Sequence, residues 1–156
     1  MALSSPLAGI RAEKIFGSPV LFSGLASLIL CKSEVDVISH HVKETVQNLL
    51  KLYNNTPDVV IFFVSGTLPG EAILHSRQLT VFGMICRLPG NILNTIAQNL
   101  LLAMGEKDTS WFGQIRSLCH QYALPHPLKL LEQQSDKEEF KFSVKAKITE
   151  FWQRKL

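Results

Sequence analysis

The side chains that could do chemistry in this 156-residue sequence are its three cysteines, its five histidines and its scattered carboxylates. Cys119-His120, with His126 nearby, could supply soft ligands to a metal ion, and His75 offers another imidazole. A structural zinc site needs paired Cys or His residues at short separations, and the sequence holds no second pair of this kind. We therefore predict no metal site, and we expect the chain to use no cofactor.

The sequence also lacks the common catalytic motifs. It has no Gly-x-Ser-x-Gly nucleophile elbow, and its carboxylates are scattered rather than clustered as two-metal phosphoryl transfer requires. Two glycines, Gly66 and Gly70, precede a predicted helix, but Glu71 follows where a phosphate-binding loop needs a lysine. We predict no catalytic residue, no enzymatic activity of the chain itself and no small-molecule ligand.

A cationic surface is the stronger candidate site. Lys137, Lys141 and Lys145 recur every four residues along a predicted helix, with further basic residues and Trp152 nearby, and Arg77 lies on an earlier helix. Such a ridge can contact nucleic-acid phosphates, so we predict these four basic residues as contacts to RNA or DNA. Acidic residues share the last helix, so a solvated, salt-bridged face is the alternative. They are Asp136, Glu138, Glu139 and Glu150.

Composition and charge are those of an ordinary globular domain. Hydrophobic residues make up 46% of the chain and charged residues 19%, so low hydrophobicity does not impose disorder. The net charge of +3 permits a nucleic-acid partner but is far from that of a strongly basic binder. Cys31, Cys86 and Cys119 are odd in number and lie in apolar surroundings, which predicts buried thiols in a reducing compartment. We expect an intracellular protein, in the cytoplasm or the nucleus.

The uncharged stretch from Ile15 to Cys31 imitates a membrane span or a signal peptide. A spanning helix needs about 20 mainly apolar residues, and this stretch is shorter and interrupted by Gly17, Pro19 and Gly24. We predict a helix that begins at Pro19 and packs in the core, and we expect no membrane partner.

Apolar residues recur at intervals of three and four through most of the chain, which predicts amphipathic helices. Ser33, Ser110 and Ser135 are the predicted N-caps of three of them, the last forming a capping box with Glu138. The predicted fold is all-α, an irregular array of about six to eight helices.

The segment from Thr56 to Gly66 is ambiguous, because its β-branched and aromatic run favours a strand. Its ends favour a helix, with Pro57 at the first helical position and Gly66 as the stop. Since no other strand-like run could pair with it, we predict a short buried helix.

We predict three regions along the chain. Residues 1–14 form a disordered N-terminal end, because their first part is small, polar and proline-containing. Residues 15–124 form the helical core, and residues 125–156 form a C-terminal helical segment hinged at Pro125 and Pro127.

Three stretches taken together resemble a known family. They are Ser18 to Leu28, Ser65 to Leu79 and Ser110 to Arg116. The pattern is similar to the helical region that follows the polymerase core in reverse transcriptases of non-long-terminal-repeat (LINE-type, jockey-like) retrotransposons. There an aromatic-x-Gly, a long amphipathic helix and a Gly-x-x-Pro precede a helix that bears an arginine. Here these are Phe22-Ser-Gly24, the helix from Ser33, Gly66-Thr-Leu-Pro69 and Arg77.

The resemblance covers most of the chain, from about Ile15 to Trp152, and it implies a function. It implies a non-catalytic segment that helps to hold template RNA, primer or nascent duplex beside an active site elsewhere in a larger polymerase. The family's paired-aspartate motif, endonuclease domain and Cys-His zinc knuckle have no counterpart in this sequence. The alternative is a helical protein-interaction or scaffold fragment that ignores nucleic acid and packs on the remainder of a larger protein.

Overall fold

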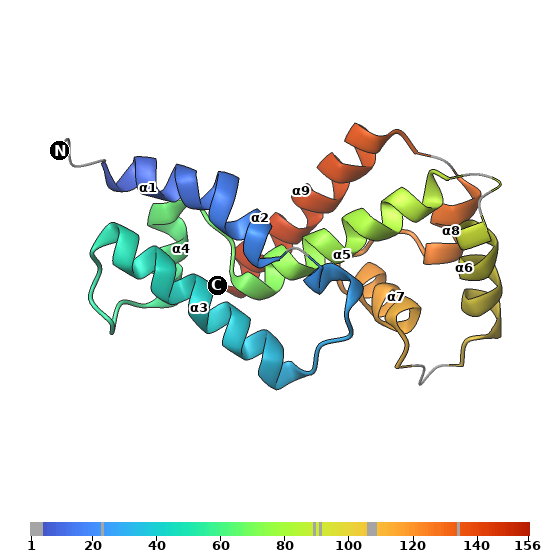
Figure 1. Cartoon of the computed structure of the whole chain (residues 1–156), viewed down its shortest axis with the longest axis horizontal. Helices are drawn as coiled ribbons and strands as arrows, with labels where there is room; N and C mark the ends of the chain where they lie inside the picture. The colour runs from blue at the N-terminus through green and yellow to red at the C-terminus, as the bar shows by residue number, and fades with distance from the viewer. Residues whose placement is uncertain (1–4, 23, 89, 91, 106–108, 134) are drawn as a thin grey trace. The chain divides into compact units, whose positions relative to one another are not determined.

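A computed structural model of the chain describes residues 5–22, 24–88, 90, 92–105, 109–133 and 135–156, with the backbone alone at residues 15 and 16. These residues form nine α-helices, one π-helical turn and one short 3-10 helix, and they contain no strand (Figure 1). The all-α class is therefore confirmed. The α-helices are α1 (Pro6–Ala12), α2 (Ser18–Leu21), α3 (Lys32–Leu50), α4 (Asp58–Ser65), α5 (Gly70–Cys86), α6 (Ile92–Ala103), α7 (Trp111–Gln121), α8 (Pro127–Glu132) and α9 (Lys137–Lys155).

The chain divides into two compact units, and the division falls within α5. The first unit comprises Met1–Leu25, Leu30–Leu74 and Leu156, and the second comprises Ala26–Ile29 and His75–Lys155. The boundary predicted at residue 125 is thus not where the chain divides. The reason is that α8, which begins at the second of the two prolines, packs on α6 and α7 and belongs to the same unit as they do.

The first unit begins with helix α1, where the composition predicted a disordered end. Ser5 caps this helix, since its Oγ accepts a hydrogen bond from the Ala8 N–H at 3.3 Å. Ile10 is buried in a cluster with residues of α3 and α4, so packing rather than local composition orders the segment. The prediction of disorder is wrong from residue 6 onward, and residues 1–4 lie outside the described part of the chain.

The helical backbone continues from α1 into α2 through a π-helical turn, η1 (Glu13–Gly17). The Ser18 N–H donates to the Glu13 carbonyl, five residues back. Pro19 follows directly and has no N–H to donate. When π-helix occurs, it is mostly a single turn within an α-helical segment, as it is here. The helix predicted from Pro19 to the end of the apolar stretch therefore stops at Leu21, and a 3-10 helix, η2 (Leu25–Ser27), follows Gly24, whose φ is +79°.

Helices α3 and α4 pack on each other. Both were predicted as helices, but the start of α3 and the burial of α4 differ from the prediction. The Cys31 N–H donates to the Glu34 carboxylate at 2.8 Å, so α3 begins at Lys32 rather than after a Ser33 cap. The segment that could have been a strand is a helix, and Gly66 ends it with a φ of +59°. It is not buried as predicted, because only one side faces α3, and Phe63 is 86% exposed.

The close contact between α3 and the first residue of α5 depends on Gly70. A Cβ at this position would lie 2.8 Å from the Ser39 Cα and 3.2 Å from the Ile38 carbonyl oxygen. The Glu71 N–H also donates to the Ser39 hydroxyl at 3.1 Å. Because the crowding atoms belong to the backbone, they cannot move away by a change of rotamer.

We expect Gly70→Ala to lower the free energy of unfolding by about 1–3 kcal/mol, the usual cost of overpacking. Urea denaturation followed by far-UV circular dichroism measures the change. Gly105→Ala is the matched control, because a Cβ there meets no atom within 4 Å. Equal stability of the two variants would contradict the close contact.

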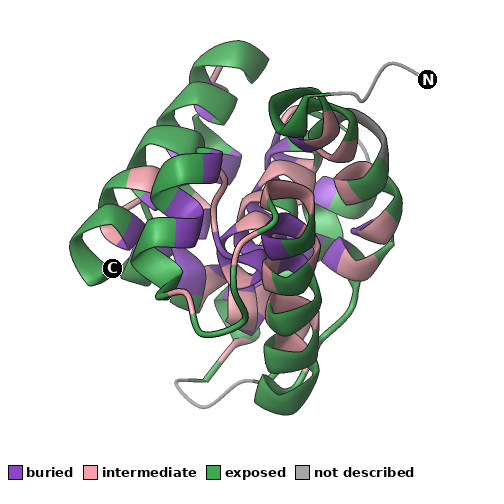
Figure 2. Ribbon diagram, turned by 90° about the vertical axis from the view of Figure 1, so that its left-hand side faces the viewer, coloured by how far each residue is buried: buried purple, intermediate pink, exposed green. Residues whose placement is uncertain are grey.

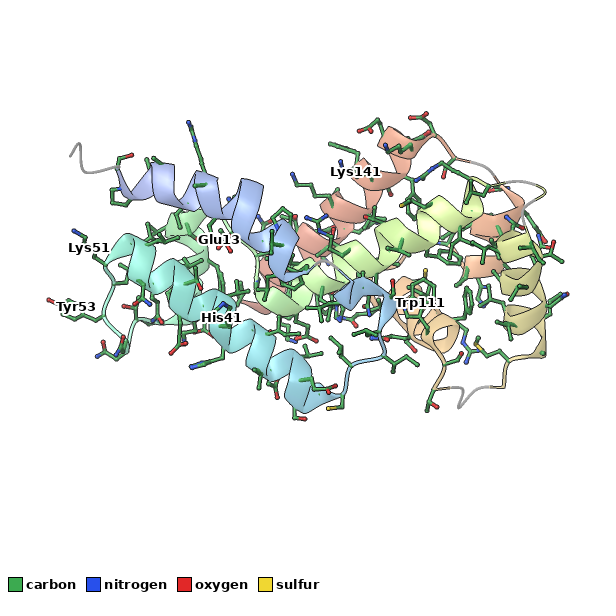
Figure 3. The ribbon with its side chains drawn as sticks, in the orientation of Figure 1. Glu13, His41, Lys51, Tyr53, Trp111 and Lys141 are labelled. Atoms are coloured by element: carbon green, nitrogen blue, oxygen red, sulfur yellow. The ribbon has the colours of Figure 1, made fainter. Side chains whose placement is uncertain are left out.

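The second unit contains the last five helices, apart from the start of α5. The predicted cap of α7 is confirmed, since the Ser110 Oγ accepts from the Gly113 N–H at 3.2 Å. Trp111, labelled in Figure 3, donates its indole N–H to the Ala26 carbonyl at 2.8 Å and so ties the 3-10 segment to α7. Gly83 of α5 lies against the Phe140 ring of α9, so these two helices also pack together.

Helix length and composition determine whether a segment can span a bilayer. Within the described ranges, no single helix is both long and apolar enough to cross a membrane. The bent pair α4 and α5 passes the same test when the two helices are taken together. Core helices pass it as well, and both members of the pair contribute buried residues, among them Ile61 and Phe82.

Candidate nucleic-acid interface

The predicted cationic ridge lies on α9, whose start is set by Asp136. The Asp136 carboxylate accepts hydrogen bonds from the backbone N–H groups of Glu138 at 3.0 Å and Glu139 at 3.4 Å. The capping box predicted from Ser135 is therefore wrong by one residue. An aspartate is a good N-cap, because its negative charge also meets the positive end of the helix dipole.

A buried stripe orients α9. The spacing of four, four and three residues predicts Phe140, Val144, Ile148 and Phe151 on this buried side. The first three are buried, but Phe151 is only half-buried and Trp152 is buried instead. Buried residues are purple in Figure 2. Trp152 is only 5% exposed, so it belongs to the core and not to the cationic surface on which we predicted it. Apart from Thr149 and Phe151, which are half-buried, the other residues of the helix are exposed to solvent.

Lys137, Lys141 and Lys145, here called the lysine ridge, are all exposed on α9 (Lys141 is labelled in Figure 3). Four helical residues rise by about 6 Å, which sets the spacing of successive amines along the axis. Within the described residues none of the three makes an ion pair or a side-chain hydrogen bond, whereas Arg154 pairs with Glu150. Among the described residues these three amines thus face solvent without a carboxylate partner.

Helix α9 also concentrates the charge of the chain. It contains six basic and three acidic residues, a surplus of three positive charges. The whole chain has a net charge of +3, so the rest of the sequence is neutral in total. The net charge of the whole chain is low, but α9 is a distinctly basic helix.

Arg77 is exposed on α5. Gly83 of the same helix packs against Phe140, next to the first ridge residues, and Arg77 precedes Gly83 by six positions, a rise of about 9 Å along the helix. Arg87 is closer, because its guanidinium and the Phe140 ring both lie against the position that a Gly83 Cβ would occupy. Arg87 is therefore a ridge neighbour that we did not predict, and hydrophobic spacing alone carries no signal for it.

His75 is a buried member of a polar network rather than a basic surface residue. Its Nδ1 lies 2.6 Å from the Tyr122 hydroxyl oxygen, which also accepts a hydrogen bond from the Trp152 indole N–H at 3.1 Å. Burial, and to a lesser extent the charge of Lys155, lowers the pKa of His75 from 6.5 to about 4. His75 is therefore neutral at pH 7 and cannot attract phosphate.

A pocket of about 520 Å³ opens beside this network, here called the α9 pocket. Its walls carry two aromatic rings and four charged side chains. The lining residues are Gln121, Tyr122, Ala123, Lys147, Glu150, Phe151, Arg154 and Lys155. The Lys155 amine lies 4.5 Å from the centroid of the Trp152 ring, within the range of a cation–π interaction. We did not predict this pocket, although Phe151 and Lys155 are spaced for neighbouring positions on a helix.

The two buried thiols, those of Cys86 and Cys119, are unsuited to nucleophilic chemistry at neutral pH. Burial raises the pKa values of Cys86 and Cys119 to about 12, and the protonated thiol is a poor nucleophile. Cys31 is exposed, so the prediction that it is buried is wrong. No group of three or more His, Cys, Asp or Glu residues in the described chain is placed to hold a metal ion.

Comparisons of the chain with protein-family models, with curated proteins and with solved structures found no match.

Proposed function

We propose that this chain is a helical module that contacts nucleic acid and that its lysine ridge binds backbone phosphates. The observation that carries the proposal is the ridge itself. Its three exposed lysines have no acidic partner among the described residues, and they lie on the helix that holds the whole positive surplus. The resemblance to the region after the polymerase core of LINE-type reverse transcriptases supports the same ligand. On that reading the chain is a non-catalytic fragment that helps to hold template and primer.

The proposed contact is electrostatic. Each lysine that neutralises a phosphate releases condensed counterions, so the affinity falls with increasing salt. Contacts to phosphates position a protein on a duplex and carry no direct sequence information. We therefore expect binding of RNA, DNA and hybrid duplexes with little preference for sequence.

Replacing the three ridge lysines by glutamine tests the proposal. We expect the triple variant Lys137→Gln, Lys141→Gln, Lys145→Gln to reduce the slope of log K against log salt by about 2.7 on a DNA duplex, roughly 0.9 for each phosphate that is no longer neutralised. Fluorescence anisotropy of a labelled duplex at several salt concentrations measures the slope.

The control removes the same charge elsewhere. Arg11, Lys32 and Lys129 are exposed and lie on other helices, so their joint replacement by glutamine should leave most of the slope intact. An equal loss in the two triple variants would mean that net charge, not the ridge, determines binding. Absence of binding by the unmodified chain at low salt would overturn the proposal.

A second candidate function is a protein-interaction module, and exposed apolar residues on α6 favour it. Ile92, Ile96 and Leu100 follow one another every four residues and are each at least 43% exposed. An apolar row of this kind is typical of a face that packs on another protein. If this is the function, the chain should associate with itself while ignoring nucleic acid, and Ile96→Gln with Leu100→Gln should abolish the association in sedimentation experiments.

A further inference from the structure

We infer that the α9 pocket binds one unpaired nucleotide of a nucleic-acid strand, with the base against Phe151 and the phosphate near Lys147 and Lys155. This inference rests on the proposed function and narrows its ligand from any duplex to a strand with a single-stranded end. The pocket belongs to the second unit and is formed by the end of α7, the residues that follow it and the last turns of α9.

Aromatic rings form one wall of the pocket. Tyr122 and Phe151 meet edge to face with their centroids 5.2 Å apart, and Phe151 meets Trp152 in the same way at 5.8 Å. Tyr122 and Trp152 are buried, whereas Phe151 is only half-buried and lines the cavity. Phe151 is therefore the ring against which a flat ligand can stack, and every nucleobase presents such a flat face.

The charges around the pocket favour an anion. Three basic side chains and one carboxylate line it, and that carboxylate, Glu150, pairs with Arg154. Lys147 has no acidic partner within the described residues, and Lys155 lies over the Trp152 and Phe151 rings. Two basic side chains thus lie beside an aromatic wall, the combination by which proteins hold single strands.

The part of the pocket wall formed by Tyr122 and Ala123 is held in place by hydrogen bonds and by a turn. The Leu124 N–H donates to the Cys119 carbonyl at 2.8 Å, and Ala123 adopts a left-handed conformation with φ of +51°. This turn ends α7 directly after Tyr122, whose hydroxyl is held by His75 and Trp152. The cavity of about 520 Å³ lies within the usual range for small-ligand sites.

The experiment compares two probes on the full-length chain, a blunt duplex and the same duplex with a short 3′ overhang that carries 2-aminopurine. We expect the chain to bind the overhang at least about fivefold more tightly, the effect of one stacked base, and to quench the 2-aminopurine fluorescence. Phe151→Leu should remove both the preference and the quenching. Phe142→Leu is the matched control, since Phe142 lies on the same helix, 76% exposed and outside the pocket.

A second variant keeps the test valid if Phe151→Leu unfolds the chain. Lys147→Gln, at an exposed position, should reduce the salt slope for the overhang probe by about 0.7 and leave that for the blunt duplex unchanged. Equal binding of the two probes, or a preference that survives both substitutions, overturns the inference and leaves the proposed function standing. Binding of neither probe at low salt overturns both.

Discussion

Replacing Tyr122 by phenylalanine is expected to lower the free energy of unfolding of the second unit by about 2–4 kcal/mol. The substitution keeps the ring and removes only the hydroxyl, which lies 2.6 Å from the His75 Nδ1 and 3.1 Å from the Trp152 indole nitrogen. A hydrogen bond lost by a buried polar group costs about 1–3 kcal/mol, and here two groups each lose one to the same hydroxyl. Urea denaturation followed by tryptophan fluorescence measures the loss, because Trp111 and Trp152 both belong to this unit.

The chain offers a matched control in its other tyrosine. Tyr53 is 84% exposed, so Tyr53→Phe should change the stability by less than about 0.5 kcal/mol. The loss in Tyr122→Phe should also appear as a changed urea midpoint without a changed slope. A Tyr122→Phe variant as stable as Tyr53→Phe would show that the shared hydroxyl contributes nothing to the fold.

Features that depend on residues close together in the sequence, such as the buried side of a helix and its N-cap, could be predicted. The spacing of Phe140, Val144 and Ile148 indicated the buried side of α9, and with it the exposed position of the lysine ridge. N-caps can also be predicted from local sequence, because the capping side chain binds a backbone N–H two or three residues further on. Ser110 is the example here. The N-cap of α9 was predicted one residue too early, at Ser135. Asp136 is an equally good capping residue, and it lies nearer to the first turn of the helix.

Contacts between distant residues account for the parts that could not be predicted. Helix α1 is ordered because Ile10 reaches a cluster that contains Ile61, more than 50 residues away in the sequence. His75, Tyr122 and Trp152 come from α5, the end of α7 and α9, so neither their network nor the neighbouring pocket has a local signature. The sequence therefore predicted the exposed position of the ridge lysines but gave no indication of the pocket.

Acidification should destabilise the second unit through His75. Folding lowers the pKa of this histidine from 6.5 to about 4, because burial disfavours the charged ring. Above pH 6.5 the ring is neutral in both the folded and the unfolded chain, so the full stability is present. As the pH falls from 6.5 to about 4, the unfolded chain binds a proton that the folded chain does not, and stability is lost. The shift corresponds to about 3 kcal/mol lost between pH 7 and pH 4.

Carboxylates titrate in part of the same range, so the histidine contribution must be isolated by difference. His75→Gln removes the titrating group and keeps a side chain that can hydrogen bond to Tyr122, so its stability should depend less steeply on pH between 6.5 and 4. His41→Gln removes an exposed histidine and should retain the dependence of the unmodified chain. Urea midpoints measured across this range by tryptophan fluorescence give both slopes. Parallel curves for the three proteins would mean that His75 is hydrated or charged in the folded state, which is incompatible with its burial to 7% exposure.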